Sequence, residues 1–150
     1  MKKRLVALIA LVLTLMACGQ TNKPPQKVQS AFSEKFTSVK SLKWEKENNG
    51  WEAEFKMNDM KMSASFTEAG EWLETETEIK TKDVPADIIN AVKSKFVGWN
   101  IDEVEKLEKP DFKGYEVDLK MKKSEKEILV SETGEITINN ENEEGEKDED

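Results

Sequence analysis

Histidine is absent from this 150-residue chain, and cysteine, arginine and tyrosine occur once each, as Cys18, Arg4 and Tyr115. Without histidine, the chain lacks the usual acid–base group of neutral pH. A single thiol cannot form a disulfide within the chain. One arginine leaves almost none of the planar guanidinium groups that hold phosphate through two hydrogen bonds. These absences disfavour histidine- or thiol-dependent catalysis and zinc binding.

Charged residues, in contrast, make up 36% of the chain, and the net charge is −8. A protein of this sign repels phosphate, so we expect no nucleic-acid partner. Residues 141–150 carry seven acids against Lys147. Such a segment cannot bury apolar surface, and it lacks the ligand spacing and turn glycine of a calcium loop. We therefore expect residues 140–150 to form a disordered acidic tail that binds no metal.

The N-terminus has the composition of a secretory signal. Lys2, Lys3 and Arg4 precede Leu5–Ala17, a stretch of thirteen residues that is apolar apart from Thr14. Thirteen residues are too few to span a bilayer, which takes about 20. The length and the basic flank fit the apolar core of a signal peptide. We predict that residues 1–17 are a signal peptide.

The cysteine lies where this apolar run ends. Leu15, Met16, Ala17 and Cys18 resemble the lipobox of bacterial lipoproteins. The resemblance implies acylation of the Cys18 thiol and cleavage before it. Two or three acyl chains hold a protein stably on a membrane, where one does not. Cleavage would remove three positive charges, taking the net charge from −8 to −11. We expect residues 18–27 to form a tether between the lipid and the folded domain, and we expect the mature protein to face the periplasm.

The rest of the chain repeats itself. The segment "VQSAFSEKF" from Val28 corresponds to "IINAVKSKF" from Ile88, 60 residues later. The segment "GWEAEFKM" from Gly50 corresponds to "GYEVDLKM" from Gly114, 64 residues later. One insertion of about four residues between the helix and the first hairpin reconciles the two offsets. We predict two repeats, residues 28–80 and 83–139, that share one core, since neither could close a core alone.

Each repeat begins with a helix and continues as strands. Apolar residues at helical spacing follow Pro25, and the segment "DVPAD" before Ile88 gives the same signal. Apolar and charged residues then alternate, as in half-buried strands. We expect strands at 42–46, 51–57, 60–66, after the turn "TEAGEW", and at 101–107, 115–121, 127–131 and 136–139. The predicted fold is α+β, an α-β-β-β-β unit occurring twice, with both helices on one face of an antiparallel sheet.

Two pairs of aromatic residues occupy equivalent repeat positions. Trp51 and Tyr115 point inward by strand alternation. Phe36 and Phe96 end the apolar stripes of the two helices, so we expect both to be buried.

A family resemblance emerges from this pattern. The chain contains, in order, a proline, V-x-x-A-F-x-x-x-F, a tryptophan strand, G-W-E-A-x-F and G-E-W. This series of motifs resembles the PepSY-like lipoproteins of the bacterial envelope. The resemblance covers about Pro24 to Ile138 and implies a fold similar to tandem units of the beta-lactamase-inhibitor-protein kind. It implies no catalytic residues. PepSY domains are suspected of binding or restraining peptidases, which implies a binding role.

Carboxylates are the remaining candidates for chemistry. Glu52 and Glu54 share one strand face, as do Glu116 and Asp118, and lysines alternate with both pairs. Charged residues of this kind are rarely buried unpaired, so we expect a wet, charged sheet face without catalytic, cofactor or metal sites. By alternation, Trp72 shares a strand face with Glu74, Glu76 and Glu78, which suggests exposure, whereas its repeat partner Ile136 is a typical core residue. If exposed beside these acids, Trp72 would anchor a partner.

The sequence thus favours a non-catalytic, monomeric lipoprotein of the cell envelope that binds a protein or peptide on its sheet. The predicted contact residues are Glu52, Glu54, Trp72, Glu116 and Asp118. The family resemblance also fits an inhibitor-like role. A negative face favours a basic patch on the partner. Two alternatives stay open: an envelope hydrolase that uses carboxylates alone, and a structural envelope protein with no specific ligand. Carboxylates in a closed apolar cleft would favour the hydrolase.

Lipidation of Cys18 can be tested directly. Cys18→Ala should leave the chain unprocessed or release it from the membrane fraction, because the acylated thiol is gone. Cell fractionation and the size of the product on a gel measure both effects. A variant that still sediments with membranes as a cleaved species would show that the lipobox interpretation is wrong.

Overall fold

The computed structural model describes residues 23–138, so the predicted signal peptide, Cys18 and the acidic tail lie outside it. The described residues form an α+β fold with two helices and eight strands, which confirms the predicted secondary structure. In chain order the elements are α1 (Gln26–Lys35), β1 (Lys40–Glu47), β2 (Gly50–Met57), β3 (Met60–Thr67), β4 (Trp72–Ile79), η1 (Thr81–Asp83), α2 (Ala86–Lys95), β5 (Asn100–Lys109), β6 (Phe112–Met121), β7 (Ser124–Ser131) and β8 (Ile136–Ile138).

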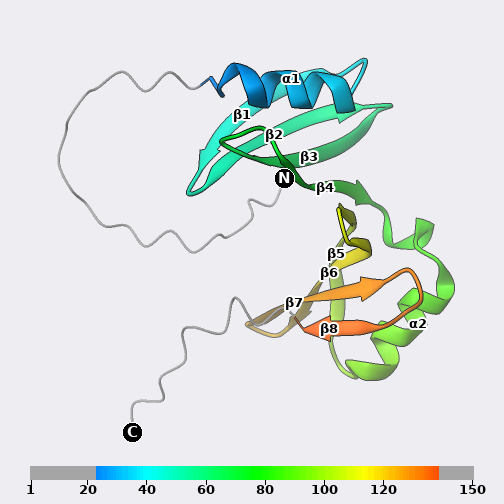
Figure 1. The fold of residues 1–150 in the computed structure, drawn as a ribbon. Coiled ribbons are helices and arrows are strands. Elements are labelled where there is room, and N and C mark those ends of the chain that lie inside the picture. The colour runs from blue at the N-terminus through cyan, green and yellow to red at the C-terminus, as the bar shows by residue number, and fades with distance from the viewer. Residues whose placement is uncertain (1–22, 139–150) are drawn as a thin grey trace, which may run out of the picture.

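All eight strands belong to one antiparallel sheet whose spatial order follows the chain from β1 to β8. Tight turns connect most neighbours. Asn58 and Asp59 both have positive φ between β2 and β3, as a two-residue hairpin turn requires. The pairing of β4 with β5 joins the two halves of the chain. The sheet twists strongly at this joint, so the two halves run in different directions (Figure 1).

The two helices start and pack alike. Pro25 and Pro85 precede their first residues, where the fixed φ of proline costs nothing. Each helix buries two apolar residues one turn apart, Val28 and Phe32 in α1 and Ile88 and Val92 in α2. Neither described helix has the length and apolar character needed to cross a membrane.

Each helix contributes to a separate hydrophobic core. The core of the first half is aromatic: the Phe32 ring packs edge-on against Phe55, with 5.1 Å between ring centroids, and against Trp44 at 5.2 Å. Its buried members are Val28, Phe32, Phe36, Trp51, Ala53, Phe55, Ala64 and Phe66. The core of the second half is aliphatic, and its buried members are Val84, Ile88, Val92, Val104, Val117, Leu119, Ile128 and Val130.

The prediction of a single shared core is therefore wrong for the described residues. Cross-strand pairing shows why. Met62 of β3, which packs against the first core, pairs with Thr77, and Thr77 pairs with Lys106. Lys106 in turn pairs with Tyr115, which packs against the second core. Two polar side chains thus stand between the apolar clusters, and the twist at the β4–β5 joint turns the halves apart.

The expected burial of the repeat aromatics holds in the first half only. Trp51 and Phe36 are both buried, at 7% exposed each. Tyr115 and Phe96 are half-buried and pack against the margin of the second core.

Gly50 and Gly114 locate the extra residues of the second half. A Cβ on Gly50 would lie 2.1 Å from the carbonyl oxygen of Phe66, and one on Gly114 would lie 2.2 Å from that of Val130. Glu47 pairs with Gly50 across two turn residues, whereas Leu107 pairs with Gly114 across six. The insertion therefore lengthens the β5–β6 hairpin. It does not lie between helix and hairpin, as the sequence offsets suggested.

Unequal burial of the two phenylalanines has a measurable consequence. Phe36→Ala should destabilise the protein by about 3–5 kcal/mol, because it opens a cavity in the aromatic core. Phe96→Ala should cost clearly less, because part of that ring is already in water. Urea unfolding of the full chain in detergent measures both, and equal losses would contradict the packing described here.

Candidate functional site

Nine carboxylates line one face of strands β4 to β7. Alternation along each strand and direct pairing between strands place all nine on the face opposite Val104, Val117 and Ile128 of the second core. We call this surface the acidic face. Its members are Glu74, Glu76 and Glu78 on β4, Glu103 and Glu105 on β5, Glu116 and Asp118 on β6, and Glu125 and Glu127 on β7.

Like charges lie directly opposite one another on this face. Glu105 pairs with Glu78 on one side and with Glu116 on the other. Asp118 pairs with Glu103 and with Glu127. Like charges opposite each other repel, so this arrangement depends on cations and hydrogen-bond donors near the acids. The clustered negative charge also attracts further cations to this surface.

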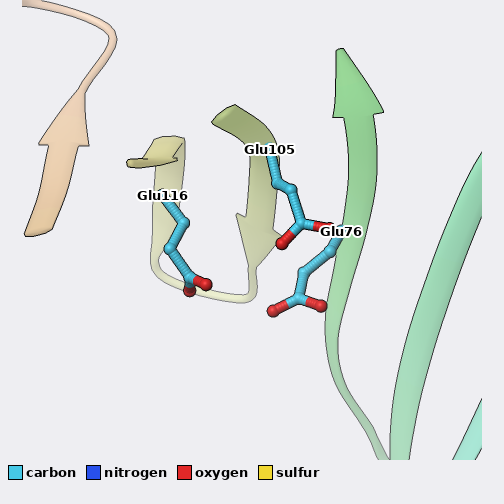
Figure 2. Close-up of side chains that lie close together, drawn as sticks. All are labelled: Glu76, Glu105 and Glu116. Atoms are coloured by element: carbon cyan, nitrogen blue, oxygen red, sulfur yellow. The ribbon is translucent and has the colours of Figure 1, made fainter. Parts of the chain in front are cut away.

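Three of the carboxylates converge. One carboxylate oxygen from each of Glu76, Glu105 and Glu116 lies within 4.8 Å of the other two (Figure 2). Glu76 is only 6% exposed and accepts a hydrogen bond of 2.7 Å from the Ser63 hydroxyl. The expectation that the strand-face acids are wet is therefore wrong for Glu76. Fixed, half-buried carboxylates of this kind are suited to holding a cation.

A second trio, Glu116, Asp118 and Glu127, has the same spacing. Carboxylate oxygens are the ligands that Ca²⁺ prefers, but Ca²⁺ takes about six to eight of them. Either trio supplies three residues, so neither completes a metal site by itself. An ammonium or guanidinium group, which needs fewer contacts, fits the same oxygens.

Lysines surround the acidic face and show what it attracts. Lys109 of β5 lies 3.0 Å from Glu74, and Lys61 of β3 lies 2.7 Å from Glu78. Burial lowers the pKa of Lys109, but the hydrogen bond to Glu74 and the charges of Glu74, Glu116 and Glu76 outweigh it, so the pKa is raised. The hydrogen bond to Glu78 likewise raises the pKa of Lys61. Loss of the lysine proton therefore weakens these ion pairs only above the ordinary lysine pKa of 10.5.

An apolar spot lies among the acids. Leu107 is fully buried on this face and pairs with Glu76 on one side and with Gly114 on the other. The Phe112 ring lies over Gly114, since a Cβ there would come within 2.8 Å of its Cζ atom. Lys109 and Phe112 both belong to the lengthened part of the β5–β6 hairpin. The insertion thus adds one cation and one aromatic ring to the acidic face.

The predicted contact residues do not form one surface. Glu116 and Asp118 belong to the acidic face, whereas Glu52 and Glu54 lie on β2, with three strands in between. Glu54 pairs with Ser63, the residue that donates to Glu76, so a polar row connects the two regions.

Trp72 lies on the opposite side of the sheet from the acids. A bulge in β4 skips Leu73, so that Trp72 pairs with Phe66 and packs against the first core. Its indole N–H donates to the Thr75 hydroxyl at 2.9 Å, and the Lys35 ammonium lies 3.6 Å from the ring centroid. The suggestion that Trp72 shares a strand face with Glu74, Glu76 and Glu78 is therefore wrong. Strict alternation assigned Trp72 to the wrong face because the bulge shifts the register by one residue.

The family of the chain is now clear. The model of a family described as "Putative beta-lactamase-inhibitor-like, PepSY-like" matches residues 21–65 and 52–137, well over half of the chain. The chain belongs to the PepSY-like family. No curated protein matches this PepSY-like chain.

Solved structures from Bacteroides share the fold. A BLIP-like protein from Bacteroides fragilis is 24% identical, with a TM-score of 0.70, over 79% of this chain and 86% of that one. A DUF2874 family protein from Bacteroides uniformis is 23% identical, with a TM-score of 0.69, over 76% and 86% of the two chains. A protein from Bacteroides eggerthii described as one of the "putative periplasmic proteins" is 22% identical, with a TM-score of 0.68, over 76% and 86%. Identities this low establish the fold alone.

Repulsion on the acidic face predicts an unusual mutational effect. Glu116→Gln should stabilise this PepSY-like protein by up to about 1 kcal/mol at low salt, because the amide keeps the size of the side chain and removes one of the opposed charges. The gain should shrink as salt screens the remaining acids. Thermal unfolding of the full chain in detergent at two salt concentrations measures the effect. The matched control is Glu125→Gln, which loses an ion pair with Lys120 and should lower stability slightly. A salt-independent loss in Glu116→Gln would refute the repulsion.

Proposed function

We propose that this chain is a lipid-anchored, non-catalytic binding module of the bacterial cell envelope. Its acidic face captures a protein or peptide partner through that partner's basic residues. The observation that carries the proposal is the convergence of carboxylates from adjacent strands, within 4.8 Å of one another on an otherwise regular sheet. Opposed acids weaken the sheet by themselves, and a bound cation relieves that repulsion.

Lys109 serves as an internal example of the ligand. Its ammonium group contacts Glu74, and the charges of Glu116 and Glu76 act on it as well. A partner's lysine or arginine would meet the same carboxylates from outside. Charge complementarity of this kind mainly raises the association rate and the selectivity for basic partners.

The lipid anchor and the family support an envelope setting. The lipobox-like segment that ends at Cys18 would hold the domain on a membrane, which raises its local concentration near envelope partners. A relative of the same fold is described as periplasmic. The family description names inhibitor-like proteins, and we infer an inhibitor-like mode in which the sheet covers a surface of the partner without turnover.

We also infer that the two halves are copies of one helix-plus-four-strand unit, with both helices on one face of the sheet. Directly paired residues point to the same face of a sheet. One row of pairs supports this, because it runs from the first core to the second: Phe55, Met62, Thr77, Lys106 and Tyr115. The face opposite this row is then the one that carries the acids.

One observation favours a second function, a hydrolase that uses carboxylates alone. Glu76 is buried beside Glu105 and Glu116, and paired carboxylates about 5 Å apart can act as nucleophile and acid. Turnover of a peptide or glycan that is lost in Glu76→Gln would establish the enzyme in place of the binding module.

Binding to a defined basic peptide tests the proposal. A fluorescent peptide of alternating lysine and glycine should bind the full chain in detergent, and salt should weaken the binding. Reversal of two acids, Glu105→Lys with Glu116→Lys, should weaken binding about tenfold or more, or about 1.4 kcal/mol. Lys109→Gln should strengthen it, because the internal competitor is gone. Fluorescence anisotropy gives the dissociation constants.

The matched control keeps the net charge of the reversal variant and moves it elsewhere. Glu34→Lys on α1 combined with Glu132→Lys on the β7–β8 turn changes two exposed acids outside the acidic face. It should alter binding much less. Equal losses of peptide affinity in the two double variants would mean that net charge alone attracts the peptide. That result would contradict the proposed binding site. An absence of binding to any basic peptide would favour a structural role.

A further inference from the structure

Methionine is concentrated in one hairpin. Met57, Met60 and Met62 lie within six residues, at the end of β2 and the start of β3. Among the described residues, Met121 is the one further methionine. The turn between β2 and β3 consists of Asn58 and Asp59, with φ of 52° and 61°, so Met57 and Met60 flank the tightest connection that two strands allow.

The three side chains share one face. Met57 pairs directly with Met60, and Met62 pairs with Phe55 of the aromatic core. Met57 and Met62 are partly buried against that core, whereas Met60 is 41% exposed. Cβ atoms of directly opposite residues are about 4.5–5.5 Å apart, and diagonal neighbours are about 7–8 Å apart. Unbranched methionine side chains, with three rotatable bonds, can bring their sulfur atoms together across such distances.

The second hairpin carries other residues at two of the three positions. Its turn between β6 and β7 also has two residues, of which Lys122 has a positive φ of 57°. Met121 corresponds to Met57, whereas Ser124 and Lys126 occupy the positions of Met60 and Met62. The second half thus keeps the methionine before the turn and has polar residues at the two positions after it. Because these strand positions accept polar side chains, packing alone does not explain the exposed methionine at position 60.

We propose that Met57, Met60 and Met62 form a three-thioether site for Cu(I). Soft thioether ligands select Cu(I) over the harder divalent ions. The site is at the rim of the first core, where Met60 is exposed to solvent and Met57 and Met62 are partly buried against the core. Thioethers carry no proton to displace, so binding should not change between about pH 5 and pH 8, unlike binding to thiols or imidazoles.

Silver ion is a redox-stable probe of the same softness. The full chain carrying Cys18→Ser, which removes the one thiol, is titrated in detergent with Ag(I) in nitrate buffer. Methionine methyl groups labelled with ¹³C report each thioether separately by NMR. The methyl signals of Met57, Met60 and Met62 should shift together and saturate at one equivalent. Those of Met1, Met16 and Met121 should not move below that point.

Two variants separate a site from chance contacts. Met60→Ser copies Ser124 of the second hairpin, so it should fold, and it should weaken Ag(I) binding by at least about tenfold, the lower range for loss of even an indirect contact to a metal. Met121→Leu is the matched control and should bind as the parent does. Unchanged affinity in Met60→Ser, or equal shifts at all methionines, would overturn the proposal. Affinity that falls steeply between about pH 5 and pH 3 would do the same, since carboxylates, which ordinarily become protonated in that range, would then be the ligands.

Discussion

The pairing of β4 with β5 is the contact on which the rest of the molecule depends. It runs from Thr75 opposite Glu108 to Ile79 opposite Val104 and turns two four-stranded halves into one sheet. It also places the acids of β4 beside those of β5 and β6. Without this joint, the halves would each keep a helix and a core, but Glu76, Glu105 and Glu116 would not meet. The same backbone hydrogen bonds therefore define the sheet and assemble the acidic face.

Two different cores hold this sheet in place. Edge-to-face contacts of Phe32 with Phe55 and Trp44 organise the first half, and branched aliphatic residues around Val92 and Val117 fill the second. Aromatic rings cover more area per residue, whereas β-branched side chains suit the pleated surface of strands. Between the cores, the β4–β5 joint has a polar pair, with Thr77 opposite Lys106. The two cores share no buried residue, so we expect that each can be altered without opening the other.

The sequence predicted local structure well because its signals are local. Alternation identified the strands, and the apolar stripes identified both helices. The acidic face could be predicted only in part, through Glu116 and Asp118. Long-range pairing decides which strands lie beside β4. The contacts of Glu76 and Glu105 could therefore not be predicted from the sequence. The bulge at Leu73, which reverses the side of Trp72, and the longer β5–β6 hairpin leave no mark in the hydrophobic pattern.

The lengthened β5–β6 hairpin gives the acidic face a resident counter-ion. Lys109 is fixed in the fold, so its effective concentration at the carboxylates exceeds that of any free cation at ordinary salt. A sodium ion or a single lysine must compete with a tethered ammonium group that is already hydrogen-bonded to Glu74. In the proposed binding mode, a partner with several basic groups would engage several carboxylates at once, so competition from Lys109 would weaken its binding less than that of a single cation. The hairpin would therefore favour partner surfaces on which positive charge is clustered.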